Sequence, residues 1–202
     1  MKRQLMIAAP AVKRQLIAAA LAKRQLLIAA LVVIGVLALI GKLAPRGPEK
    51  PFTREGIHVV PTPEGADATD GKFRINLPEV PTVIRGDSTT VALATRSKRV
   101  NVLFTIATPK EFAADDVLGL AGGFTLGFGI TNPTWTPGTL AGLNAGTASG
   151  DGTWEDKPRH IRMWAVAAPT QKRFYVLVAI GTMDTTPADL EQVATRIAFV
   201  NP

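Results

Sequence analysis

Residues 26–41, LLIAALVVIGVLALIG, form an uninterrupted apolar stretch that divides the chain into two parts of different character. Helices of soluble domains normally carry a polar face, which this stretch lacks. The 17 uncharged residues 25–41 would reach roughly 25 Å as a helix, and flanking basic side chains extend that reach toward a ~30 Å hydrocarbon core. The pattern predicts a transmembrane helix over residues 25–43. Its predicted membrane-anchoring residues are Lys23, Arg24, Leu26, Val33, Gly35, Leu39 and Lys42.

The charges around this stretch predict how the chain is oriented. Six Lys or Arg precede it, and three more lie between residues 42 and 50. Since basic flanks stay in the cytoplasm, we expect a cytoplasmic N-terminus and a periplasmic or other extracytoplasmic C-terminal domain at the cell inner membrane. A cleaved signal peptide is the alternative, but cleavage after Ala44 would place Lys42 where a small residue is required.

The first 26 residues contain three copies of KRQL, beginning at residues 2, 13 and 23. Steps of 11 and 10 residues are close to three helical turns, so the basic pairs share one side of a predicted cytoplasmic helix. Such a helix is suited to an anionic lipid leaflet. A tandem duplication with no role beyond topology is an equally open interpretation. The predicted lipid contacts are Lys2, Arg3, Lys13, Arg14, Lys23 and Arg24.

The positive charge of the chain is confined to its start. Residues 1–50 hold nine basic residues and one acidic residue, whereas residues 51–202 hold 14 basic and 15 acidic residues. The second part therefore lacks the basic surface that nucleic-acid binding requires, and we expect no nucleic-acid partner. The chain has no cysteine, which excludes disulfides, thiolate metal sites and a lipid-modified cysteine.

The remaining chain is predicted to be a linker and one folded domain. Five prolines and four glycines between residues 44 and 71 predict an extended linker, so the domain would span residues 72–202. Two hydrophobic runs, Arg159–Ala168 and Arg173–Gly181, predict a strand hairpin. Residues 109–121 and 187–200 predict helices, and the glycine-rich residues 122–130 predict a bent strand or tight loop. The expected fold class is α+β, an antiparallel sheet with flanking helices.

Residue patterns for catalysis are missing from this domain. His58 and His160 lie far apart, and no G-x-S-x-G nucleophile elbow or phosphate-binding loop is present. We therefore expect a protein that is not an enzyme and that uses no cofactor or metal. Trp135 and Trp154 lie near predicted loops, and because aromatic residues are enriched at interfaces they are the interface candidates.

Three segments carry a resemblance to a known family: KFRINLP at 72–78, RFYVLVAIGT at 173–182 and PADLEQVATRIAFV at 187–200. With the strands between them, residues 72–200 resemble the PsbP-like superfamily. The resemblance implies a central antiparallel sheet with helices on its faces. It also implies a non-catalytic accessory subunit or a binding module.

Two functions are therefore expected. The first is a single-pass accessory or structural subunit of a larger membrane complex, respiratory or photosynthetic, whose partners are integral membrane subunits. Small residues in the apolar stretch, such as Ala29 and Gly35, would permit helix packing there. The alternative is a free-standing envelope module that binds a small ligand or lipid.

Overall fold

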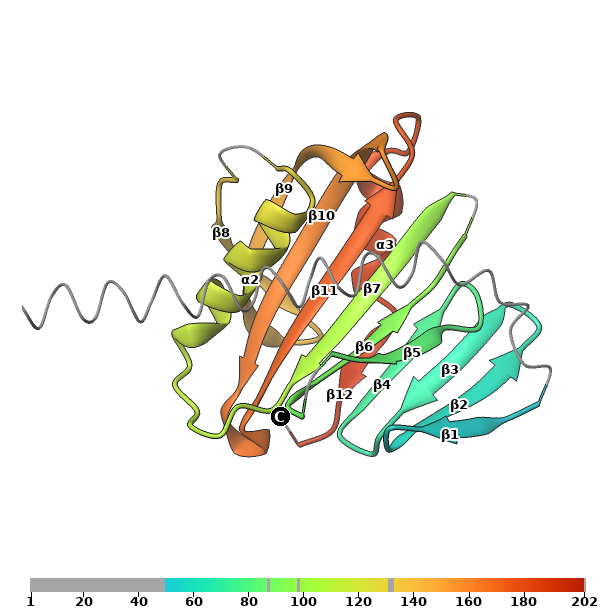
Figure 1. The fold of residues 1–202 in the computed structure, drawn as a ribbon, viewed down its shortest axis with the longest axis vertical. Helices are drawn as coiled ribbons and strands as arrows, with labels where there is room; N and C mark the ends of the chain where they lie inside the picture. The colour runs from blue at the N-terminus through green and yellow to red at the C-terminus, as the bar shows by residue number, and fades with distance from the viewer. Residues whose placement is uncertain (1–49, 87, 98, 131–132, 202) are drawn as a thin grey trace, which may run out of the picture.

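The computed structural model describes residues 50–86, 88–97, 99–130 and 133–201 (Figure 1). Strands hold 52% of the described residues and helices 16%, and the strands form two antiparallel sheets. The predicted α+β class is therefore wrong, and the described part of the chain is mostly β-sheet. The basic segment 1–24 and the predicted span 25–43 lie outside the described residues.

The larger sheet contains seven of the described strands in the order β5-β6-β7-β11-β10-β9-β8. Its two longest strands, β9 and β10, pair over ten positions, from Lys157 opposite Trp154 to Val166 opposite Ala145. The predicted hairpin at residues 159–181 is confirmed, with a short 3-10 turn, Pro169–Gln171, between its strands. The strand bounds are β5 Thr82–Arg85, β6 Thr90–Ala94, β7 Val100–Ala107, β8 Thr136–Leu140, β9 Leu143–Trp154, β10 Lys157–Ala168 and β11 Arg173–Gly181.

The smaller sheet corrects the predicted linker. Its five described strands follow the order β1-β2-β3-β4-β12, and three of them lie within residues 44–71. Prolines in this region did not prevent strands, because Pro61 lies near the end of its strand, opposite Ala66. The bounds are β1 Phe52–Arg54, β2 Ile57–Thr62, β3 Gly65–Thr69, β4 Phe73–Leu77 and β12 Ile197–Phe199.

The larger sheet is covered on both faces, which explains the continuous apolar run of its central strand, β11. Tyr175, Leu177 and Ala179 enter the core that the larger sheet shares with the smaller sheet. Their neighbours Phe174, Val176 and Val178 enter a second core on the opposite face. Successive side chains of a strand point to opposite faces, so a strand covered on both sides has no polar alternation.

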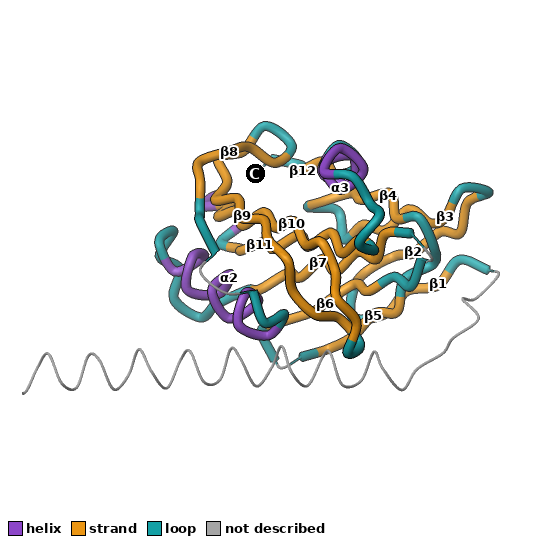
Figure 2. The backbone as a smooth tube through the Cα atoms, turned by 90° about the horizontal axis from the view of Figure 1, so that it is seen from above, coloured by secondary structure: helices purple, strands orange, loops and turns teal. Residues whose placement is uncertain are grey.

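Helix α2 (Asp116–Gly127) lies against the second core, over β10 and β11 (Figures 1 and 2). The predicted helix at 109–121 was placed too early, and the predicted strand or loop at 122–130 is mostly helical. Glycine weakens an isolated helix. Here the helix is held by Val117, Ala121 and Phe124, which are buried against the sheet.

Helix α3 (Pro187–Ala194) packs on the other face of the larger sheet through the buried side chains of Leu190 and Val193. The Thr186 hydroxyl accepts a hydrogen bond from the Asp189 N–H, and the Asp189 carboxylate accepts one from the Thr186 N–H. This capping box fixes the start of the helix. The predicted extension to residue 200 is wrong, because Ile197 leaves the helix and pairs with Ile75 of β4.

Neither helix of the described residues is long and apolar enough to cross a membrane, since α2 has 12 residues and α3 has eight. The prediction of a single-pass transmembrane protein therefore has no support from the described structure.

Candidate functional site: a polar cleft between the sheets

A cleft of about 220 Å³ opens at one end of the space between the two sheets. The larger sheet contributes residues two positions from core residues, which therefore lie on the face toward the smaller sheet: Val91 precedes Leu93 by two, and Thr108, just after β7, follows Ile106 by two. The smaller sheet contributes two turns and the start of β2. The lining consists of Glu55, Ile57, Asp70, Arg85, Ser88, Thr89, Thr90, Val91, Ile106, Thr108 and Arg173.

Two ion pairs cross this cleft from one sheet to the other. Arg85 Nη1 of β5 lies 3.1 Å from Glu55 Oε2, in the turn between β1 and β2. Arg173 Nη1 at the start of β11 bonds to Asp70 Oδ2, in the turn between β3 and β4. The second pair is the more buried, with side-chain exposures of 19% for Arg173 and 11% for Asp70. Both sheets are therefore joined at the mouth of the cleft by opposite charges.

The Arg173 guanidinium is held as a cation in this environment. Burial alone would lower the pKa of Arg173, but its hydrogen bond to Asp70, with a contribution from Tyr175, raises that pKa above the ordinary value. Its Nε is buried and makes no hydrogen bond within the described structure. An unpartnered buried donor carries a desolvation cost.

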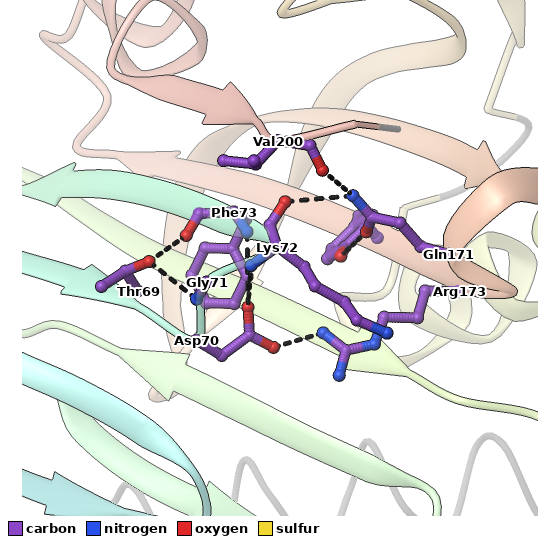
Figure 3. A network of polar contacts seen from close by, with 9 residues as sticks. Thr69, Asp70, Gly71, Lys72, Phe73, Gln171, Arg173 and Val200 are labelled. Atoms are coloured by element: carbon purple, nitrogen blue, oxygen red, sulfur yellow. Dashed lines mark hydrogen bonds and ion pairs between the residues drawn. The ribbon is translucent and has the colours of Figure 1, made fainter.

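The turn that carries Asp70 is fixed by its own hydrogen bonds (Figure 3). Asp70 Oδ1 accepts hydrogen bonds from the N–H groups of Lys72 at 2.9 Å and Phe73 at 3.3 Å. The Thr69 hydroxyl accepts from the N–H of Gly71 at 3.1 Å and donates to the carbonyl of Phe73. Gly71 has φ of +85°, a left-handed conformation that suits glycine. One carboxylate oxygen of Asp70 thus shapes the turn while the other faces Arg173.

A buried polar group lies directly behind the cleft. Tyr175, with Phe73 and Phe104, forms an aromatic cluster whose ring centroids are 5.0–6.1 Å apart. The Tyr175 hydroxyl donates a hydrogen bond to Gln171 Oε1. Burial raises the pKa of Tyr175 in spite of the lowering effect of Arg173, so the hydroxyl remains a neutral donor at physiological pH.

The cleft is lined by two ion pairs and by residues that carry hydroxyls. These residues are Ser88, Thr89, Thr90 and Thr108, and neither histidine lines the cleft. His58 Nδ1 lies 3.0 Å from the Thr53 hydroxyl, and His160 lies between Asp151 Oδ1 at 2.6 Å and the Met183 carbonyl at 3.1 Å. Within the described ranges, no three His, Asp or Glu side chains are grouped so as to hold a metal ion.

The sequence-predicted site residues lie elsewhere. Trp154, predicted as an interface residue, is 4% exposed in the second core, where its ring centroid lies 5.7 Å from that of Phe128 at a tilt of 32°, so its side chain presents little surface to a partner. Trp135 is half-buried at the edge of that core. The membrane-anchoring and lipid-binding candidates are outside the described residues: Lys2, Arg3, Lys13, Arg14, Lys23, Arg24, Leu26, Val33, Gly35, Leu39 and Lys42.

The residues that line the cleft were not predicted from the sequence. They come from separate turns and strand ends between Glu55 and Arg173, and no two of the charged ones are adjacent in the chain. The charge pairing of Asp70 with Arg173 spans 103 positions. Only the turn chemistry of Asp70-Gly71 was visible locally, because Asp and Gly favour tight turns.

No protein-family model and no curated protein matches the chain. The PsbP-like resemblance therefore stays a prediction. Three solved structures show a distant similarity. A protein from Bacteroides thetaiotaomicron is 11% identical with a TM-score of 0.41, and the match covers 63% of this chain and 45% of that one. This chain thus spans about half the length of that protein.

The other two structures are similarly distant. LpqN of Mycobacterium tuberculosis, described as involved in cell envelope biogenesis, is 15% identical over 63% of this chain and 83% of that chain, with a TM-score of 0.39. The type VI secretion immunity protein TplEi of Pseudomonas aeruginosa is 11% identical over 79% and 53%, with a TM-score of 0.35. All three scores are below 0.5, so these similarities carry no argument about function.

Proposed function

We propose that the chain is a non-catalytic binding module whose inter-sheet cleft takes a small, uncharged polar ligand. The observation that carries this proposal is the composition of the cleft. Two arginines and two carboxylates line it as pairs, so a charged ligand would meet no net complementary charge. A neutral ligand meets N–H donors, carboxylate acceptors and hydroxyls that serve as both.

The pairs themselves are unsuitable partners for an ionic ligand. Separating Arg173 from Asp70 would leave two largely buried charges without partners, which is costly. A ligand that hydrogen-bonds to the remaining donor and acceptor positions leaves the pairs intact. This reasoning supports a neutral ligand over a simple anion or cation.

The size and floor of the cleft narrow the ligand further. At about 220 Å³ it is smaller than the roughly 300–1,000 Å³ of sites for drug-sized ligands. Ile57, Val91 and Ile106 give the cleft an apolar side beneath the polar groups. We expect a compact ligand with one apolar side and several hydrogen-bonding groups.

Titration of the full ¹⁵N-labelled chain tests the proposal. The neutral probes are glycerol, myo-inositol and acetamide, and the charged probes are acetate, phosphate and methylammonium. We expect neutral probes to shift the backbone signals of Thr90, Val91 and Thr108 selectively. Shifts spread over the surface, or selective binding of the charged probes, would contradict the proposal.

Two variants identify the site. Replacing Thr108 by valine keeps its shape but removes a hydroxyl on the cleft side of the larger sheet, so it should weaken binding of the neutral probes several-fold. Thr134→Val is the matched control, because Thr134 is exposed and does not line the cleft. An equal effect of both changes would show that the Thr108 hydroxyl is not used.

An accessory subunit of a larger membrane complex is the second candidate. Leu118 and Leu126 of α2 are 50% and 64% exposed, an apolar feature that a partner protein could cover. Scattered exposed leucines are also normal on monomers, so the cleft supports binding of a small ligand better. Mild purification of the tagged full chain tests the accessory role. Stoichiometric co-purifying membrane subunits would support it, and a clean monomer would not.

The proposed location is the cell envelope, with the folded domain outside the cytoplasm. A basic segment followed by an apolar stretch at residues 1–41 supports export, because this order is typical of export signals. A reporter fused after the last residue, active only outside the cytoplasm, tests this location. Activity of a cytoplasm-specific reporter at the same position would contradict it.

A further inference from the structure

Gln171 joins three separate segments behind the cleft (Figure 3). It ends the 3-10 turn before β11 and is 8% exposed. Its Nε2 donates to the carbonyls of Lys72 at 3.1 Å and Val200 at 2.8 Å, and its Oε1 accepts from the Tyr175 hydroxyl. Both donor positions and the acceptor of the amide are thus in use, which defines the orientation of the side chain.

The Lys72 carbonyl connects this amide to the C-terminal segment. It also accepts a hydrogen bond from the N–H of Val200 at 2.8 Å, so Val200 is bound both to Lys72 and to Gln171. Val200 directly follows β12, whose Phe199 pairs with Phe73 of β4. The end of the described chain is therefore fastened to the turn between β3 and β4.

The same turn presents Asp70 to the cleft. The Lys72 N–H donates to Asp70 Oδ1, and the Lys72 carbonyl accepts from Gln171 Nε2. The backbone of Lys72 therefore links the side chain of Gln171 to the carboxylate of Asp70. Asp70 Oδ2 then accepts from Arg173, the first residue of β11, which lies two residues after Gln171. Three hydrogen bonds and the backbone from Gln171 to Arg173 together form a closed circuit through Gln171, Lys72, Asp70 and Arg173.

We infer that Gln171 is a positioning residue that couples the C-terminal segment to the cleft. It holds the turn 69–73 so that Asp70 meets Arg173, and loosening Val200 loosens that pair. An apolar side chain at position 171 would fill the space but leave the Lys72 and Val200 carbonyls and the Tyr175 hydroxyl with fewer partners. The effect on ligand binding rests on the proposed function, whereas the effect on the Asp70–Arg173 pair does not.

The test compares four versions of the full chain with the original. Gln171→Met removes both donors and the acceptor, Gln171→Glu keeps the acceptor, and a chain ending at Phe199 removes Val200. Val102→Ala is the matched control, because it opens a cavity in the same inter-sheet core, and Val102 pairs with Ala179 on β11, away from Tyr175 and Gln171. The Arg173 Nε–H signal reports on the ion pair, and titration with myo-inositol reports on the cleft.

We expect Gln171→Met and the shortened chain to shift or broaden the Arg173 side-chain signal and the amide signals of residues 70–73. Binding of myo-inositol should weaken about tenfold in both. At neutral pH, Gln171→Glu should show the same changes in the Arg173 signal and in myo-inositol binding. Both should return toward the original values as the pH falls, because a protonated carboxyl can donate to one carbonyl. The original chain, measured at each pH, corrects for effects of pH that do not depend on residue 171.

Two results would overturn the inference. One is an unchanged Arg173 signal in Gln171→Met with a lower Tm, the behaviour expected of Val102→Ala. The other is a Gln171→Glu chain whose Arg173 signal does not recover at low pH. If myo-inositol does not bind the original chain but the Arg173 signal responds as expected, the coupling stands and the proposed ligand class fails.

Discussion

Replacing Arg173 by methionine removes the cation that joins the two sheets at the cleft but keeps an unbranched side chain of similar reach. Asp70, whose side chain is 11% exposed, then retains only its backbone donors, the N–H groups of Lys72 and Phe73. Breaking a buried pair costs about 3–5 kcal/mol. Because residual exposure and two backbone donors remain here, we expect Arg173→Met to lower the free energy of unfolding by about 2–3 kcal/mol.

Replacing Asp70, the partner of Arg173, should lower the free energy of unfolding by less. Asp70→Asn keeps an oxygen that accepts from both backbone donors and leaves the Arg173 cation 19% exposed. We expect a loss of about 1–2 kcal/mol, and a loss of about 2–3 kcal/mol for the double variant. The single losses then exceed the double loss by a coupling energy of about 1–2 kcal/mol, within the range for residues in contact.

Urea unfolding of the four full chains measures this coupling, followed by far-UV circular dichroism and by the fluorescence of buried Trp154 and Trp164. The Arg74–Asp67 pair is the matched control, because its side chains are 68% and 26% exposed. Exposed pairs contribute about 0–1 kcal/mol, so its coupling should be smaller. A coupling for Asp70–Arg173 below about 0.5 kcal/mol, or no larger than that of the control, would refute a clamp between the sheets.

Three further predictions concern the scaffold of the cleft. Gly65→Ala should lower stability by about 3 kcal/mol or more in urea unfolding, because φ is +142° and the new Cβ would lie 2.0 Å from the Leu77 carbonyl oxygen; a neutral change would contradict that backbone. Leu190→Asp should lower it by several kcal/mol through burial of an unpaired charge, and an unchanged Tm would show that α3 is not docked. Hydrogen bonds from Asn76 and then Arg74 lower the pKa of Asp67, so its contribution to stability is present above the unfolded pKa near 3.8 and is lost as the pH falls through the lowered value. Asn76→Ala should therefore reduce the loss of Tm as the pH falls below about 3.8, and an unchanged acid profile would contradict this assignment.

Strands with strong local patterns were predictable from the sequence. The runs at 159–168 and 173–181 correspond to β10 and β11. These signals are local, because β-branched and aromatic side chains fit a pleated, buried surface. The start of α3 was equally visible in Pro187 and the acidic first turn, which reflect unpaired N–H groups at a helix start.

Elements whose state depends on distant partners were mispredicted. Ile197 keeps helical spacing from Val193, yet it pairs with Ile75, 122 positions earlier in the chain. The glycines of α2 indicated a loop, but packing of Ala121 and Phe124 against the larger sheet holds a helix there. In both cases contacts with residues distant in the sequence outweigh a weak local preference, and a local stretch of sequence does not reveal those contacts.

The sequence by itself determined the charge division at residue 50, the absence of thiol chemistry and the antiparallel hairpin at the centre of the larger sheet, because each is a property of composition or of neighbouring residues. The tertiary structure alone decided that residues 52–69 form strands and that Trp154 is buried. It also decided the cleft. Asp70 and Arg173 meet only because two sheets, each assembled from distant strands, pack face to face and bring their turns to the same end.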